Sequence, residues 1–185
     1  MKVTKVLGSI CAAAMMVAAL GALSGCNADE ANEKVIRDSL TEELEPYKTH
    51  DSSVIGQIRS QNAVALATIG IDGDEYANAL LDGFDYSIED ITVNGKDATA
   101  TLVLTQKDID EAEAEVIMEE LAADPAFAEM SQDERKAQVS DKIFEYINGV
   151  EAAAQDPITI DFVLNGNIWE PTEESQLRMA NLFTF

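Results

Sequence analysis

Apolar residues recur along this chain with two different periods, and the changes of period mark the expected elements. A spacing of three or four residues is typical of helices that bury one face, and it predicts helices before, between and after two stretches of strict alternation. We expect these helices over about residues 29–44, 53–69, 73–82, 108–123, 132–149 and 173–183, and the fifth could run on toward Ala154.

Particular residues mark the ends of these helices. We expect Pro46 to end the first, because proline pushes the preceding residue out of the helical conformation. Asp72 stands where it can begin the third. Ser131 and Glu134 have the spacing of a capping box and should open the fifth, which could continue past Gly149. The residues expected on the buried stripes of the helices include Val64, Val116 and Leu177.

Two stretches alternate between apolar and polar residues and predict β-hairpins. The first runs from Phe84 to Thr105 and turns at Asn94-Gly95, the strongest short signal for a hairpin. Its apolar phase slips by one residue near Glu89-Asp90, which predicts a β-bulge. The second runs from Ile158 to Trp169 and turns at Asn165-Gly166.

This order of elements predicts an α+β fold. Two hairpins can join into one antiparallel sheet of about four strands, and helices have to cover its apolar face. The helices of residues 108–154 then form a helical insertion between the hairpins. The length suits a single domain, which we expect over residues 34–185.

The first 26 residues have the pattern of an export signal. Lys2 and Lys5 precede an uncharged, alanine-rich run that ends in Leu23-Ser24-Gly25-Cys26. These four residues resemble the lipobox of bacterial lipoproteins, which implies cleavage before Cys26 and acyl chains on its thiol and amine. We therefore expect a signal peptide at 1–25 and a short tether at 26–33. An uncleaved membrane helix and an ordinary signal peptide are the alternatives.

Such an anchor would hold the domain on the outer face of a membrane. Two or more acyl chains anchor a protein stably, whereas one gives only marginal binding. The other cysteine, Cys11, lies in the leader, so the processed domain has no thiol for a disulfide or a thiolate metal site.

A net charge of −23 limits the classes of ligand that we expect the domain to bind. Nucleic-acid phosphates and anionic lipid headgroups both require basic residues, so we expect neither as a ligand of the domain. The acidity keeps the domain soluble and could attract a cationic partner loosely.

The hairpins carry a second resemblance. Residues 83–95 with 98–102 resemble the hairpin of small bacterial lipoproteins of unknown function, and residues 160–169 are similar to their closing hairpin, where a Trp packs onto helices. Those families are grouped with nuclear-transport-factor-2-like and cystatin-like folds, which implies a cone-like sheet. The helical insertion departs from the compact cone.

Few residues suggest chemistry. His50 is the only histidine and lies in a polar loop, so we expect a surface role and no catalytic residues, metal or cofactor. Asp72-Gly73-Asp74 lacks the spacing of a calcium loop and is better explained as a helix start. Asp85, Glu89 and Asp90 could face a cone cavity as catalytic carboxylates. The candidates for an apolar pocket are Tyr76, Phe84, Tyr86 and Trp169, although such aromatics more often fill a core.

We therefore expect a membrane-anchored extracytoplasmic lipoprotein with a non-enzymatic binding domain. Its partners would be the membrane, through lipid on Cys26, and an envelope protein or small ligand. A small hydrolase or isomerase that uses a carboxylate in a cone cavity is one alternative. A structural envelope scaffold is the other.

Overall fold

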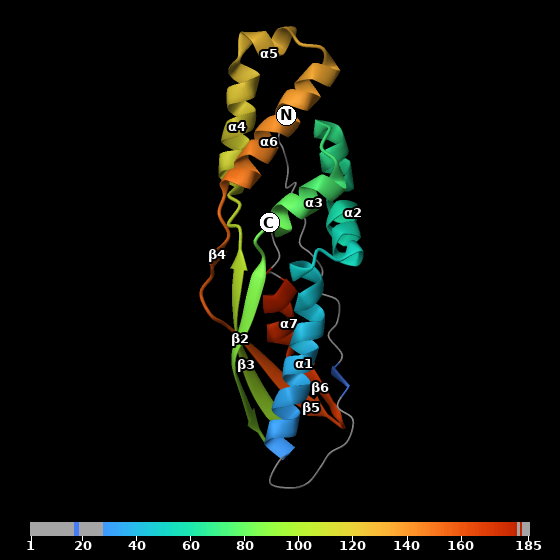
Figure 1. The fold of residues 1–185 in the computed structure, drawn as a ribbon, viewed down its shortest axis with the longest axis vertical. Coiled ribbons are helices and arrows are strands. Elements are labelled where there is room, and N and C mark those ends of the chain that lie inside the picture. Colours follow the sequence, from blue (N-terminus) through green and yellow to red (C-terminus); the bar gives the residue numbers. More distant parts are fainter. Residues whose placement is uncertain (1–16, 19–27, 181, 183–185) are drawn as a thin grey trace.

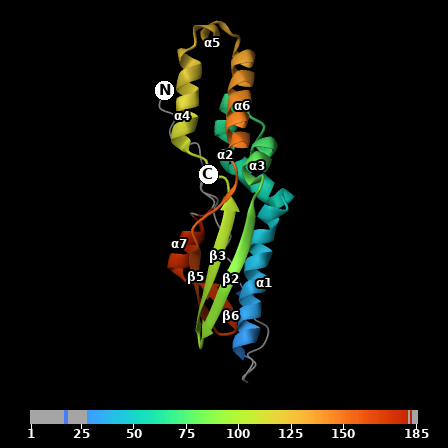
Figure 2. The same ribbon diagram turned by 60° about the vertical axis from the view of Figure 1, so that its left-hand side comes forward.

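The computed structural model describes residues 17–18, 28–180 and 182, which form one elongated molecule (Figure 1). An antiparallel sheet with α1 and α7 against it occupies one end, α2 and α3 lie in the middle, and α4, α5 and α6 form the other end (Figures 1 and 2). The helices are α1 Ala28–Lys48, α2 Ser52–Ile69, α3 Gly73–Leu81, α4 Glu111–Ala123, α5 Pro125–Glu129, α6 Gln132–Gly149 and α7 Glu173–Ala180.

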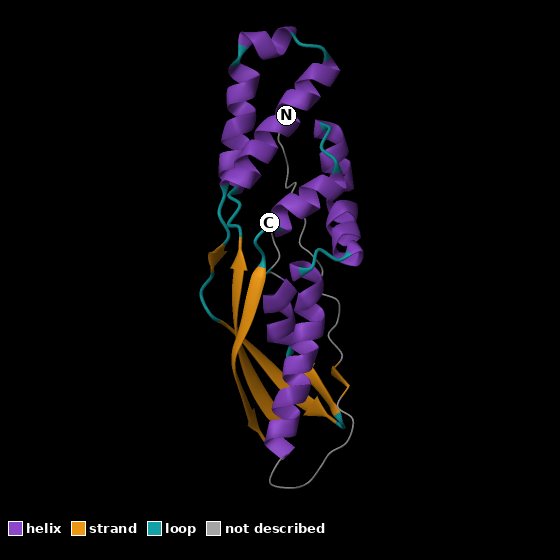
Figure 3. Cartoon of the chain, viewed as in Figure 1, coloured by secondary structure: helices purple, strands orange, loops and turns teal. Residues whose placement is uncertain are grey.

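The expected α+β fold is confirmed, with helices and sheet strands as separate groups (Figure 3). The sheet has the strand order β1-β6-β5-β3-β2, and β4 pairs with β3 beyond the end of β5. Every pairing between these strands is antiparallel. The strands are β1 Val17–Ala18, β2 Asp85–Asn94, β3 Asp97–Gln106, β4 Ala153–Ala154, β5 Ile158–Asn165 and β6 Ile168–Pro171.

Both expected hairpins are present, and so is the bulge. β2 and β3 turn at Asn94-Gly95, where Gly95 takes the positive φ of 68° that this turn requires. The register shifts between Ile88 and Asp90, so Glu89 is the extra residue of the β-bulge. The slip in the apolar pattern therefore predicted the bulge.

One face of the sheet forms the core of the molecule. Ala98, Ala100, Leu102 and Leu104 are buried on β3, while the residues between them are half-buried on the opposite face. Trp169, Phe162 and Ile160 lie completely or almost completely inside, together with Ile36 and Leu40 of α1. We call the sheet with α1 and α7 the sheet half.

The helical insertion projects as a helical hairpin, which we call the helical arm (α4, α5 and α6). Asp110, Asp124 and Ser131 cap the successive helices through their side-chain oxygens. The capping box is confirmed in both directions, since Ser131 Oγ accepts from Glu134 N and Glu134 Oε2 accepts from Ser131 N. The arm packs at its base against α3 and α2.

The expectation that Pro46 ends the first helix is wrong. α1 continues to Lys48, because proline near the last turn removes only one backbone hydrogen bond. Thr49 N bonds Glu45 O and Asp51 N bonds Pro46 O, which completes the turn. The buried ring of Tyr47, 5.9 Å from the Phe84 ring between centroids, adds packing that favours the longer helix.

Two further expectations about the helices are corrected. Val64, Val116 and Leu177 are exposed instead of buried, so the faces of α2, α4 and α7 that carry them do not contribute to the core. The fifth expected helix stops at Gly149, and Ala153 and Ala154 instead form β4 against Gln106 and Thr105. Residues 153–154 form a strand because they bond to β3, which lies far away in the sequence, and a helical spacing of apolar residues does not reveal such bonds.

Candidate functional site

The residues of the expected lipid anchor lie outside the described residues. They are Leu23, Ser24, Gly25 and Cys26. Of the expected signal peptide at 1–25, the structure describes only Val17–Ala18, which form β1 on β6, and the expected cleavage before Cys26 would remove this edge strand. The first helix begins at Ala28, so residues 28–33 of the expected tether are helical and belong to the folded domain. None of the helices among the described residues has the length and apolar character that a membrane span requires.

The start of α1 and the tip of the helical arm lie at opposite ends of the molecule (Figures 1 and 2). α1 runs along the sheet half from its lower end, and α5 caps the arm at the upper end in both views. A tether attached just ahead of Ala28 would therefore leave the arm as the most distant part of the domain.

The four candidate pocket residues are spread along this long axis. Trp169 is on β6 at the lower end of the sheet, whereas Tyr76 is on α3 beyond its upper end (Figure 1). Trp169 is fully buried, and its Nε1 donates to Asn32 Oδ1 at 3.2 Å. The structure therefore does not bring Trp169 together with Tyr76.

The aromatic residues near the upper end of β2 contribute to packing between α1 and the sheet. Phe84 is buried against Tyr47, and Tyr86 donates its hydroxyl proton to Glu45 Oε2 at 2.9 Å. Lys48 Nζ lies 5.8 Å from the centre of the Tyr86 ring and donates to Asp85 Oδ1 at 2.7 Å. These contacts fasten the last turn of α1 to the first residues of β2.

The contacts between α1 and β2 shift the pKa values of the ionisable groups that make them. The hydrogen bond from Lys48 holds the pKa of Asp85 below its usual value, and the same bond raises the pKa of Lys48. Burial, followed by the hydrogen bond to Glu45, raises the pKa of Tyr86. Each of these pKa shifts is caused by burial or by a hydrogen bond between α1 and β2, so these side chains serve to join the two elements.

Glu43 and Tyr47 lie one turn apart on α1, and both have raised pKa values. Burial, with a smaller contribution from Glu42, raises the pKa of Glu43. Burial, with a smaller contribution from Glu43, raises the pKa of Tyr47 to about 12. The carboxylate of Glu43 therefore costs stability when it is ionised.

The carboxylates considered for a cone cavity lie on the exposed face of β2. Asp85 bonds Lys48, Glu89 Oε1 accepts from Ser87 Oγ, and Asp90 Oδ2 accepts from Thr92 Oγ1 at 3.1 Å. Their side chains stand on the side of the strand away from the core, where alternation and the bulge place them.

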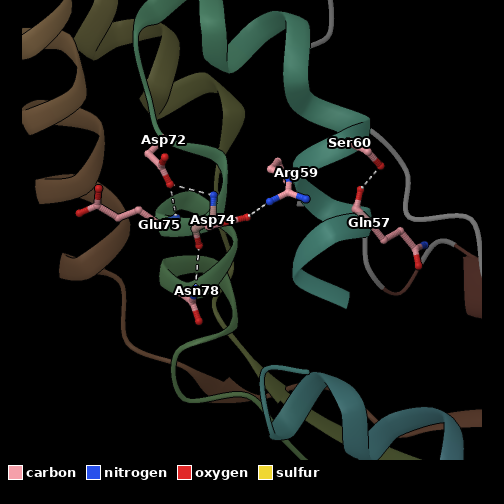
Figure 4. A network of polar contacts seen from close by, with 7 residues as sticks. All are labelled: Gln57, Arg59, Ser60, Asp72, Asp74, Glu75 and Asn78. Carbon is pink, nitrogen blue, oxygen red and sulfur yellow. Dashed lines mark hydrogen bonds and ion pairs between the residues drawn. The ribbon is translucent and has the colours of Figure 1, made fainter. Parts of the chain in front are cut away.

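The Asp72-Gly73-Asp74 segment is a helix start, as expected. Asp72 Oδ1 accepts from the backbone N–H groups of Asp74 and Glu75, at 3.0 and 2.9 Å (Figure 4). Asp74 accepts from Arg59 of α2 at 2.7 Å, which ties the two helices together (Figure 4). The described part of the chain holds no group of three or more metal-binding side chains.

The C-terminus of α3 is a joint between the parts of the molecule. Lys107, just after β3, is buried, and its Nζ donates to Ala79 O at 3.0 Å and lies 3.6 Å from Asp82 Oδ2. His50, just after α1, places Nε2 3.2 Å from Leu81 O. Cations and N–H donors suit this end of a helix, where carbonyls lack partners.

Sequence reasoning missed Lys107 and treated His50 as a surface residue. No apolar periodicity marks a lysine that follows a strand, and its burial arises because α3 folds over the end of β3. His50 was placed correctly in a loop between helices, but it is half-buried and bonded on both ring nitrogens.

Comparisons with protein-family models, with curated proteins and with solved structures found no match for this chain. The resemblance of its hairpins to nuclear-transport-factor-2-like and cystatin-like lipoproteins therefore remains a prediction.

Proposed function

We propose that this chain is a lipoprotein anchored by lipid on Cys26 to the outer face of a membrane, where its domain binds a partner without catalysing a reaction. The lipobox-like sequence, Leu23-Ser24-Gly25-Cys26, supports the anchor. The helical arm is the part of the domain that we assign to the partner.

The single observation that carries this proposal is the position of the cysteine relative to the fold. Cys26 stands two residues ahead of α1, which begins at the end of the molecule farthest from α5 (Figure 1). A lipid at Cys26 would keep the sheet half close to the bilayer and direct the arm away from it. This arrangement suits a domain that presents a binding surface at a distance from its anchor.

The use of the aromatic and acidic side chains supports binding over catalysis. Trp169 and Phe84 are buried in packing contacts, and Asp85, Glu89 and Asp90 bond their neighbours on an exposed strand face. An enzyme with a carboxylate in a cavity would need a residue of this kind turned inward beside a donor.

The anchor is tested by labelling cells that express the full chain with an alkyne fatty acid. The wild-type protein should take up the label and fractionate with membranes, and Cys26→Ala should take up no label. Cys11→Ala is the matched control, because it removes the other cysteine of the chain and should leave labelling unchanged. Labelling that survives in Cys26→Ala would contradict the proposal.

The role of the arm is tested by crosslinking in cells. A photoreactive residue at Ala128, exposed on α5, should form adducts with a neighbouring envelope protein. The same residue at Thr92, exposed on β2, is the control and should give fewer adducts. Adducts from Thr92 alone would place the binding surface on the sheet, and adducts from neither position would favour a scaffold without a protein partner.

A further inference from the structure

Three asparagines of this chain are followed by glycine, and the structure places them in three different environments. Asn94 and Asn165 are the last residues of β2 and β5, and Asn148 lies in the last turn of α6. All three residues are exposed. A glycine has no side chain to hinder its backbone nitrogen, so an asparagine that precedes glycine loses its amide most readily.

This deamidation begins when the backbone nitrogen of the glycine attacks the side-chain carbonyl carbon of the asparagine. A bond forms between that nitrogen and Cγ, the bond between Cγ and Nδ2 breaks, and Nδ2 leaves as ammonia with the proton of the glycine nitrogen. Water then opens the cyclic imide. Addition at the side-chain carbonyl gives aspartate, and addition at the backbone carbonyl gives isoaspartate. The attack therefore requires a free glycine nitrogen and an asparagine side chain that can turn toward it.

Asn94 meets both requirements. Gly95 follows β2, and none of the described residues accepts a hydrogen bond from its N–H. The side chain of Asn94 also has no hydrogen-bond partner among the residues that the structure describes. The space around Gly95 is open, since a side chain added there would meet no atom within 4 Å. We propose that Asn94 is a site of spontaneous deamidation and that the fold protects the other two Asn-Gly pairs.

Asn165 has a similar backbone setting but a restrained side chain. Like Asn94, it precedes a two-residue turn, and Gly166 has a φ of 65° where Gly95 has 68°. The Nδ2 of Asn165, however, donates to Glu170 Oε2 at 2.5 Å. This bond joins β5 to β6, and it has to break before the amide can turn toward the nitrogen of Gly166. The bond also holds the nitrogen atom that would leave as ammonia.

Asn148 is protected by the helix that contains it. Gly149 is the last residue of α6, where the backbone N–H of each residue donates to the carbonyl four residues before it. Val150 N, one residue further on, still donates to Tyr146 O at 3.2 Å, so the turn is closed around Gly149. The nitrogen that would attack Asn148 is therefore engaged, and its release would open the last turn of α6.

Deamidation of Asn94 acts on the end of the sheet where the two hairpins meet. Asn94 lies opposite Asp97 across the turn, so either product sets a new carboxylate against an existing one. Isoaspartate also lengthens the backbone by a carbon atom, which disturbs the last pair of the hairpin. Lys96 O accepts from Leu164 N at 2.8 Å, so a loosened turn weakens the link between β3 and β5. The proposal does not depend on the lipid anchor.

Ageing of the purified full chain at mildly alkaline pH tests the proposal. Samples are digested and analysed by mass spectrometry with electron-transfer fragmentation, which distinguishes isoaspartate from aspartate. We expect Asn94 to deamidate about five-fold faster than Asn165, as the breaking of one hydrogen bond implies, and Asn148 to react most slowly. In concentrated urea the three Asn-Gly pairs should react at similar rates, because the fold no longer separates them.

Two variants make the test specific. Glu170→Ala removes the acceptor that restrains Asn165, so the rate at Asn165 should rise to that at Asn94, while the rate at Asn94 stays unchanged. Asn94→Gln should abolish the fast reaction, because glutamine has to close a larger ring. The proposal would be overturned if Asn94 reacted no faster than Asn165 in the folded chain, or if the order of rates persisted in urea. An Asn165 rate that Glu170→Ala leaves unchanged would also contradict it.

Discussion

The sheet half and the helical arm bury their apolar side chains to different depths. In the sheet half, Trp169, Phe162, Ile36 and several leucines are almost completely enclosed between α1, α7 and the strands. In the arm, Ile147 is the only large side chain enclosed to that degree, and it lies at the end of α6 that joins the rest of the molecule. α5 at the tip buries no residue.

This difference teaches that the two regions are stabilised by different means. Long-range packing holds the sheet half, while the arm depends more on its caps and on contacts between two helices. Regions with few buried apolar contacts open locally at a lower free energy than the core. The arm should therefore open at a lower free energy than the sheet half, and four changes test the contrast.

The largest effect is expected from Trp169→Ala in the sheet half. Loss of a fully buried indole leaves a cavity and an unpaired Asn32, so the free energy of unfolding should fall by about 3–5 kcal/mol. Urea unfolding followed by circular dichroism measures it, since Trp169 is the only tryptophan and its fluorescence is lost. Leu177→Ala, at an exposed position on α7, is the control and should change little.

A smaller effect is expected at the joint between the two regions. Lys107→Ala removes the donor to Ala79 O inside the protein, which should cost about 1–3 kcal/mol in urea unfolding. Lys107→Met keeps the aliphatic stem and should cost less. Lys142→Ala, which breaks an exposed pair with Glu145, should cost well under 1 kcal/mol. Equal effects of Lys107→Ala and Lys142→Ala would show that the joint does not depend on the buried ammonium.

A local effect is expected from Ser131→Ala in the arm. It removes the cap of α6, which is worth about 1 kcal/mol. Hydrogen exchange followed by mass spectrometry should show faster exchange in α5 and the first turns of α6, with β3 and β5 unchanged. Ser60→Ala, on the exposed surface of α2, is the control. Faster exchange in the strands as well would show that the arm and the sheet half open together.

The smallest effect, and the only stabilising one, is expected from Glu43→Gln. The pKa of Glu43 is raised in the folded chain, mainly by burial, so the folded protein binds its proton more tightly than the unfolded chain does. Stability therefore falls as pH rises above about 4.5, and glutamine avoids this loss. Tm at pH 7 should rise by about 1–2 °C, with no gain at pH 3.5. Glu30→Gln, exposed in the first turn of α1, should instead give a slight loss.

The features that sequence predicted are those with local causes. The turn at Asn94-Gly95, the bulge at Glu89 and the capping box of Ser131 each depend on residues within a few positions of one another. Such signals need no knowledge of the rest of the fold, and together they were enough for the α+β class and both hairpins.

The features that sequence missed depend on contacts between distant segments. β4 exists because Ala153 and Ala154 meet the end of β3, and the last turn of α1 persists past Pro46 because Tyr47 packs on Phe84. The burial of Lys107 and the bonding of His50 both require α3 to lie where it does. Aromatic residues that looked like pocket candidates proved to be distributed along the molecule for the same reason.

The pairing of β4 with β3 has a consequence for the history of this chain. Gln106 and Ala153 are opposite one another, so the segment that contains the helical arm leaves the sheet and returns to it at neighbouring backbone positions. An insertion whose two ends are paired in this way can become longer or shorter, or be replaced, without altering the register of the strands. The entropy cost of closing the loop rises only slowly with its length. We therefore expect related chains to share the same sheet and to differ most in this inserted segment.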